Sequence, residues 1–279
     1  MEAFIASEAL AAGDLTRYAL AIDHRRLLPN VHVARHAELS LEERIASAWL
    51  WSRRRAVVTG LAASALHGSK WVDPASPIEL NHPNNKAPAG VITRRDTLLA
   101  DETIELGGMA VTSVPRTAFD LARRGPRVRA LERLDSLARA TRFAAHDVLA
   151  VLDAHPKVKG RRRVAEMLAL MDPGAQSPKE TWLRLLLMDA GFPRPVTQIP
   201  LLDETGYPLY FLDMGWPEFM VAAEYDGQQH RTDDQQYRSD VLRSEYVASL
   251  GWRRVRVLSG HRRDGIIARV ERLGVPRLR

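Results

Sequence analysis

The chain has 279 residues, of which 46% are hydrophobic and 27% are charged, proportions typical of a globular protein with more than one domain. It contains no cysteine, which excludes disulfide bonds, cysteine-ligated zinc and thiol nucleophiles. The absence of cysteine also fits a reducing, cytoplasmic location. We find neither an apolar run of about 20 residues nor the pattern of a signal peptide, so no membrane insertion is expected.

The net charge of +6 and the isoelectric point near 9.9 favour a polyanionic partner. The excess lies in residues 123–172, which hold 12 Lys and Arg against 6 Asp and Glu. Within this segment Arg161, Arg162 and Arg163 are the candidates for contacts with DNA phosphates. The alternative is a solvated helical face, because such faces are often rich in arginine.

Residues 1–35 predict two short helices followed by a small β-wing. Gly13 separates Glu2–Ala12 from Leu15–Arg26, and Asp14 can cap the second helix. A turn and a short strand follow, which together outline a winged helix-turn-helix. A small helical cap on the next domain is the alternative. In the winged-helix interpretation four side chains would face DNA, namely Arg17, Tyr18, Arg25 and Arg26.

Further along, residues 36–122 alternate between helical and strand patterns, and residues 123–172 predict amphipathic helices. The sequence Asp172-Pro173-Gly174-Ala175-Gln176 has the composition of a linker. We therefore predict a mixed α/β (α+β) fold with four parts, whose bounds are 1–35, 36–122, 123–172 and 173–279.

Residues 173–279 predict the element order helix, three strands, helix, strand, helix. The strands are expected at Val196–Leu202, Tyr207–Trp216, Val221–Asp226 and Trp252–Leu258. Ser177 and Glu180 have the spacing of a capping box at the start of the first helix. That spacing gives Glu180 a structural role.

The predicted hairpin carries three carboxylates close together. If its turn is centred on Glu218 and Phe219, Asp213 lies opposite Glu224, and Asp226 shares the face of Glu224. Carboxylates grouped in this way are costly to bury unless a cation neutralises them. Oxygen ligands suit Mg²⁺ or Mn²⁺, and such a site can cleave phosphate esters. The alternative is that these acids lie in a solvated turn.

This C-terminal region resembles the PD-(D/E)XK nuclease superfamily, in the branch of the very-short-patch-repair endonucleases. The resemblance rests on Ser177–Glu180, Gly191–Pro195, Asp213 with Trp216-Pro217-Glu218, Glu224–Gly227 with His230, and Leu250–Arg253. It implies catalytic roles for Glu180, Asp213, Glu224, Asp226 and His230, of which His230 would transfer protons. It also implies support from Gln198 and DNA contacts from Arg243 and Arg256.

The sequence departs from the superfamily pattern in two places. The usual lysine two residues after the glutamate is Asp226 here, and Phe211 stands where relatives often have arginine. The missing lysine puts activity in doubt, although repair-endonuclease relatives lack it too and use a histidine such as His230.

The upstream half resembles abortive-infection-type antitoxin proteins through Thr59–Gly68 and Val114–Ala122. Two hypotheses follow for the whole chain. It is either a Mg²⁺-dependent DNA endonuclease delivered to DNA by its winged helix, or a non-catalytic DNA-binding regulator or antitoxin. The expected partner is double-stranded DNA, with a second copy of the chain and a toxin or repair protein as further candidates.

Overall fold

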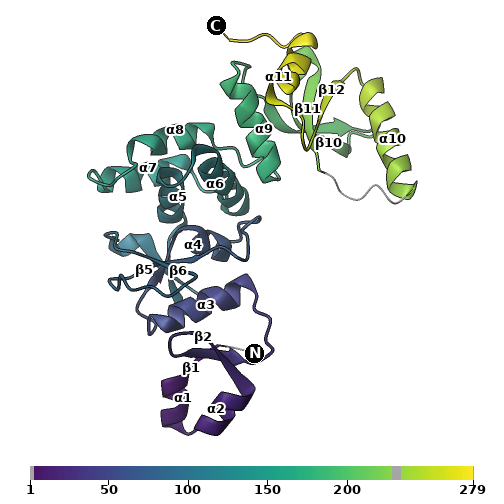
Figure 1. The fold of residues 1–279 in the computed structure, drawn as a ribbon. Helices are drawn as coiled ribbons and strands as arrows, with labels where there is room; N and C mark the ends of the chain where they lie inside the picture. The colour runs from purple at the N-terminus through teal and green to yellow at the C-terminus, as the bar shows by residue number, and fades with distance from the viewer. Residues whose placement is uncertain (1–2, 228–233, 279) are drawn as a thin grey trace. The chain divides into compact units, whose positions relative to one another are not determined.

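The computed structural model describes residues 3–227 and 234–278 and has the predicted α+β fold. The chain divides into two compact units, Met1–Met171 and Asp172–Arg279, which Figure 1 shows with their helices and strands. Within the described residues, no helix combines the length and apolar character needed to cross a membrane.

The first unit begins with a small three-stranded sheet and two helices. The elements are β1 (Phe4–Ile5), α1 (Ala6–Ala12), α2 (Arg17–Asp23), β2 (His24–Leu28) and β3 (Val31–Ala34), with the strands in the antiparallel order β1-β3-β2. Gly13 ends α1 with a φ of 79°, a conformation that glycine adopts without strain.

Two local predictions for this region were wrong. Thr16, not Asp14, caps α2, because its side chain accepts a hydrogen bond from the Ala19 N–H at 3.1 Å. The second helix ends at Asp23 rather than Arg26, because the chain from His24 pairs with β3. Arg25 and Arg26 therefore lie on a strand.

A five-stranded sheet and two helices follow. Its strands have the order β6-β5-β4-β8-β7, and Ile45, Val58, Leu80 and Val111 are buried between the sheet and the helices. The elements are α3 (Leu41–Trp51), β4 (Val57–Val58), α4 (Gly60–Leu66), β5 (Ile78–Asn81), β6 (Val91–Arg94), a 3-10 turn (Ala100–Glu102), β7 (Thr103–Leu106) and β8 (Met109–Thr112).

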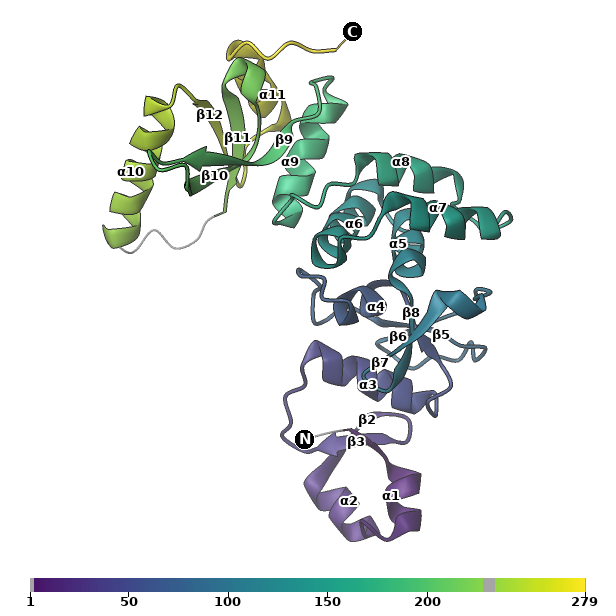
Figure 2. The same cartoon turned by 180° about the vertical axis from the view of Figure 1, so that it is seen from behind.

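Four helices complete the first unit: α5 (Val114–Arg123), α6 (Arg127–Thr141), α7 (Ala145–Ala154) and α8 (Arg162–Leu170). They bury Phe119, Leu134, Val148 and Met167 in a common core. Because α5 contacts α4, α6, α7 and α8, it joins the sheet region to this helical group, as both views show (Figures 1 and 2).

The second unit is a four-stranded sheet with helices on both faces. The strand order is β12-β11-β10-β9. Within the described strands of this sheet, the β11–β12 pair is parallel and the β10–β11 and β9–β10 pairs are antiparallel. Helices α9 and α11 lie on one side of this sheet and α10 lies on the other (Figures 1 and 2). The elements are α9 (Pro178–Asp189), β9 (Val196–Leu202), β10 (Pro208–Trp216), a 3-10 turn (Pro217–Phe219), β11 (Val221–Asp226), α10 (Asp234–Ser249), β12 (Arg253–Leu258) and α11 (Arg263–Arg272).

The predicted linker is attached to the second unit. The Asp172 carboxylate accepts hydrogen bonds from the Gly174 N–H at 2.8 Å and the Thr197 hydroxyl at 3.0 Å. Ala175 is buried. A side chain at Gly174 would collide with Thr197, so the glycine permits this close approach to β9.

Candidate functional sites

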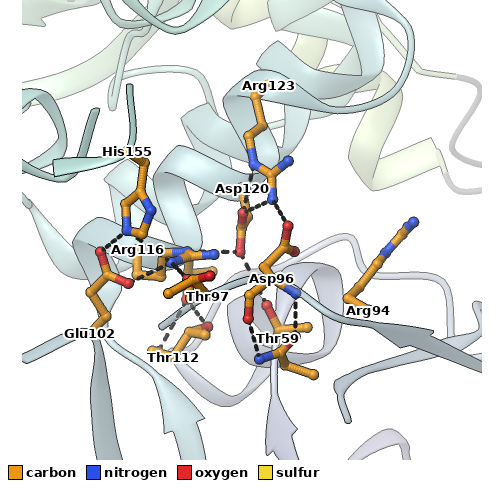
Figure 3. Close-up of polar contacts among 12 residues, drawn as sticks. Thr59, Arg94, Asp96, Thr97, Glu102, Thr112, Arg116, Asp120, Arg123 and His155 are labelled. Carbon is orange, nitrogen blue, oxygen red and sulfur yellow. Dashed lines mark hydrogen bonds and ion pairs between the residues drawn. The ribbon is translucent and has the colours of Figure 1, made fainter. Parts of the chain in front are cut away.

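A buried guanidinium organises the first unit. Arg116, on α5, is fully buried. Its guanidinium donates to the Glu102 carboxylate at 2.5 Å, the Asp120 carboxylate at 3.2 Å and the Thr97 carbonyl at 2.9 Å. His155 closes the cluster, with Nε2 at 2.6 Å from Glu102 Oε1. Figure 3 shows Arg116 between the two carboxylates. A buried charge persists only with such partners.

The same network extends through Asp120 to a third carboxylate, that of Asp96. Arg123 donates to Asp120 at 2.8 Å and forms an ion pair with Asp96 at 2.9 Å. Arg124 is ion-paired with both acids. Burial raises the pKa of Asp96, but the attraction of Arg124 and Arg123 outweighs burial and holds that pKa below its usual value. The Asp96 carboxyl is thus held in its charged form by guanidinium groups.

The two sequence motifs that carry the antitoxin resemblance meet in this network. The Thr59 hydroxyl, directly before α4, donates to Asp120 on α5 at 3.2 Å. Arg116 and Phe119 belong to the second motif, and both the Arg116 and Arg123 guanidiniums lie over the Phe119 ring at 5.7 and 5.3 Å. The network therefore fixes the sheet to the helical group. Sequence analysis missed Asp96, Glu102 and His155, because each lies outside the recognised motifs.

The predicted DNA-contacting residues of the N-terminal region differ in their surroundings. Arg17 and Arg26 are exposed, and Tyr18 has 77% of its surface exposed. Arg25 is half-buried, and its guanidinium donates to the Ala37 carbonyl at 2.9 Å. Arg17 and Arg26 are therefore the two predicted arginines with a solvent-accessible charge here.

The predicted basic patch Arg161–Arg163 is largely structural. Arg163 donates to the carbonyls of Ala122, Arg124 and Gly125 at 2.7–3.0 Å, so it satisfies the carbonyl groups at the C-terminal end of α5. Arg161 donates to the Leu152 carbonyl and to Asp153, both at 3.3 Å. Arg162 is exposed. Three nitrogens of Arg163 thus bind backbone carbonyls, and its contact with DNA stays a prediction.

In the second unit the hairpin forms in the predicted register. Met214 pairs with Ala223 and Trp216 with Val221, a register that continues to Asp213 opposite Glu224. The Asp213 carboxylate accepts a hydrogen bond from the Tyr225 N–H at 2.8 Å. The turn lies at Pro217–Phe219, and Met220 follows with a φ of 51°. The carboxylates of the two strands are therefore neighbours, as predicted.

Burial has a large effect on Asp213. It raises the pKa of the Asp213 carboxyl from 3.8 to about 7, with a further contribution from the nearby negative charge of Glu180. Glu180 comes from α9 and is buried. Its Oε2 accepts from the Gln176 N–H at 2.8 Å, and Gln198 Nε2 lies 3.5 Å from the same oxygen.

The predicted capping box is therefore only half formed. The Ser177 hydroxyl accepts from the Glu180 N–H at 3.2 Å, as a capping residue does. The Glu180 carboxylate reaches the N–H of Gln176, where the prediction had the N–H of Ser177. Glu180 thus combines a helix-start role with a position close to Asp213.

The other two predicted metal ligands are paired with arginines. Arg243 Nη2 lies 2.7 Å from Glu224 Oε1, and Arg254 Nη1 lies 2.9 Å from Glu224 Oε2. Asp226 is paired with Arg256 at 2.5 Å. The predicted DNA contacts Arg243 and Arg256 thus bind carboxylates of their own unit.

As arranged, these side chains do not fit a magnesium ion. No group of three His, Asp or Glu side chains that could hold a metal ion occurs in the part of the chain that the structure describes. His230, the predicted proton-transfer residue, lies outside the described residues. The roles of the predicted site residues in catalysis and in binding Mg²⁺ stay predictions.

Comparison with known proteins supports the antitoxin-like part of the resemblance. Residues 56–170 match the family described as the AbiEi antitoxin C-terminal domain. Two proteins of Mycobacterium tuberculosis, named Uncharacterized protein MT2308 and Uncharacterized protein Rv2248, are each 31% identical over 150 residues, which make up 53% of this chain and 54% of the relative. The chain thus spans about half the length of these curated relatives. Neither finding supports the nuclease-like part of the resemblance.

The Arg116 network yields a stability prediction. Arg116→Met should lower the free energy of unfolding of the first unit by about 3–5 kcal/mol, because it leaves buried Glu102 and Asp120 without their shared cation. Amide exchange in α5 measures this free energy. Arg162→Met, which removes an exposed arginine, is the matched control and should change it by less than about 0.5 kcal/mol. Equal small effects of both variants would contradict a central role for Arg116.

Asp213 yields a pH prediction. Because its pKa is raised in the folded state, the folded chain binds the proton more tightly than the unfolded chain, and this contribution to stability is lost as pH rises from about 4 to about 7. Asp213→Asn should therefore raise the Tm at pH 8 and have a much smaller effect at pH 5. The exposed Glu204, changed to Gln, is the control. A stabilisation by Asp213→Asn that is the same at both pH values would contradict the raised pKa.

Proposed function

We propose that the chain is a non-catalytic, DNA-binding protein of the antitoxin type. The observation that carries the proposal is the match of residues 56–170 to the AbiEi antitoxin C-terminal domain. That segment follows the small α/β region at residues 4–34, whose order of two helices and a two-stranded wing suits DNA binding. An antitoxin acts on a toxin, so a protein toxin is the second partner that we propose.

The N-terminal region offers the chemistry that a DNA surface needs. Arg17 begins α2 and Arg26 lies on β2, and both are exposed. Tyr18 and Ile22 are also exposed on α2, with 77% and 52% of their surfaces accessible. Guanidinium groups bind phosphates, and an exposed aromatic side chain can contact sugar or base. This supports α2 and the wing as the DNA-contacting face.

The basic middle segment supports a DNA contact less well. Arg123 and Arg124 belong to the buried network, Arg127 is paired with Glu166 at 2.9 Å, and Arg129 is paired with Glu132 at 3.0 Å. Charges that neutralise acids of the same unit contribute little to attraction of a polyanion. These four of the segment's 12 basic residues are thus paired with acids of the same unit.

The endonuclease hypothesis receives less support. Glu224 and Asp226, two of its three metal ligands, are each paired with guanidinium groups. The lysine that the superfamily usually has is Asp226 here. These observations favour the DNA-binding alternative over phosphodiester cleavage.

The proposal predicts salt-dependent binding that depends on the N-terminal region. A duplex taken from upstream of the chain's own gene should bind, with an affinity that falls steeply as salt rises, because phosphate contacts release counterions. Arg17→Ala and Arg26→Ala should each weaken binding and reduce the slope of log K against log salt by about 1. Fluorescence anisotropy at several salt concentrations measures both quantities.

Arg162→Ala is the matched control, because it removes an arginine of the middle segment that is also exposed. It should leave the slope unchanged. If Arg162→Ala reduced the slope and Arg17→Ala and Arg26→Ala left it unchanged, the DNA contact would lie in the middle segment, against the proposal. Metal-dependent nicking of the same duplex, lost in Asp213→Asn, would contradict the non-catalytic part of the proposal.

A further inference from the structure

The second unit holds three carboxylates that need neutralisation. Glu180 and Glu224 are only 8% and 7% exposed, and Asp213 is close enough to both for their negative charges to raise its pKa. Burial of an ionised carboxylate is costly unless a positive charge or hydrogen bonds compensate it. The raised pKa of Asp213 lowers its charge, and Glu180 accepts a hydrogen bond from the Gln176 N–H at 2.8 Å, so the question is which cation compensates Glu224.

The structure supplies guanidinium groups. Arg243 reaches Glu224 Oε1 from α10, and Arg254 reaches Glu224 Oε2 from the neighbouring strand β12, at 2.7 and 2.9 Å. Both oxygens of Glu224 are thus engaged by positively charged donors. Charge-assisted hydrogen bonds of this kind are among the stronger ones in proteins.

Each guanidinium is held in place by a further contact. Arg243 also donates to the Phe211 carbonyl at 2.9 Å and lies over the Tyr210 ring at 5.9 Å. Arg254 also donates to the Ser244 hydroxyl at 2.8 Å and is 13% exposed. The guanidinium of Arg243 therefore lies beside Phe211. Nucleases of the superfamily that this unit resembles often have an arginine at the position of Phe211. Side chains fixed in this way lose little further freedom when they bind Glu224.

We propose that Arg243 and Arg254 are built-in counter-cations that occupy the place of a divalent metal ion beside Asp213 and Glu224, so that the native second unit takes up neither Mg²⁺ nor Mn²⁺. A metal ion at Glu224 would have to displace a guanidinium from an oxygen atom. It would also experience the repulsion of two positive charges at short range, in surroundings of low dielectric constant. This inference concerns the second unit and is independent of DNA binding by the first.

The test uses Mn²⁺ as the probe and the full-length chain. Free Mn²⁺ is counted by its paramagnetic resonance signal as protein is added, and the Tm is recorded in Mn²⁺ and in chelator. The wild-type chain should show no saturable uptake and the same Tm in both conditions. Saturable uptake by the wild type that is lost in Glu224→Gln would overturn the proposal.

Removal of one guanidinium should create the uptake that the wild type lacks. Arg243→Met frees Glu224 Oε1 and should lower the Tm in chelator. With Mn²⁺ at a hundredfold excess over its dissociation constant, the Tm should rise by roughly 5–10 °C, because an ion that binds only the folded state stabilises it. A folded Arg243→Met chain that takes up no Mn²⁺ would overturn the role given to Arg243.

Two further variants keep the test decisive. Arg253→Met removes an exposed arginine that neighbours Arg254 on β12 and donates to the Phe219 carbonyl. This variant should gain no Mn²⁺ response. Arg254→Met removes the second counter-cation and is the alternative if Arg243→Met does not fold. A Mn²⁺ response in Arg253→Met equal to that of the other two variants would contradict a specific role for the Glu224 pairs.

Discussion

A carboxylate that is removed from water needs a compensating charge or hydrogen bonds, and for Glu102, Asp120 and Glu224 guanidinium groups supply it. Arg116 lies on α5. Its guanidinium binds two acids at the same time, Glu102 just before β7 and Asp120 on α5 itself. Because one cation serves two buried acids, the sheet and the helical group cannot separate without exposing an unpaired charge. The fold of the antitoxin-like segment depends on this arrangement.

In the second unit, too, arginine side chains neutralise a buried carboxylate, that of Glu224. The hairpin of this unit brings Asp213 and Glu224 together, and Arg243 and Arg254 arrive from α10 and β12. Such an arrangement satisfies the electrostatic need that a metal ion meets in an enzyme, but it supplies no Lewis acid and no activated water. This explains how a hairpin rich in acids is compatible with a non-catalytic function.

The sequence predicted those features of the fold that depend on residues close together in the chain. The alternation of apolar residues and Pro217 specify the hairpin and its register, and therefore the pairing of Asp213 with Glu224. The partners of the acids could not be predicted, because they lie far away in the chain: Glu102 and His155 are separated by 53 residues, and Glu224 and Arg254 by 30. For the same reason the sequence predicted that Arg163 contacts DNA. Its hydrogen-bond partners lie 38 to 41 residues upstream in the chain.

The measurement that tests the account most directly is hydrogen–deuterium exchange of the full chain in Mg²⁺, with and without saturating duplex DNA. Backbone amides covered by a bound partner exchange more slowly. We predict that DNA slows exchange within residues 14–35 and leaves the hairpin Pro208–Asp226 unchanged. Slower exchange in that hairpin, with none at residues 14–35, would contradict the account and place DNA at the carboxylates of the second unit.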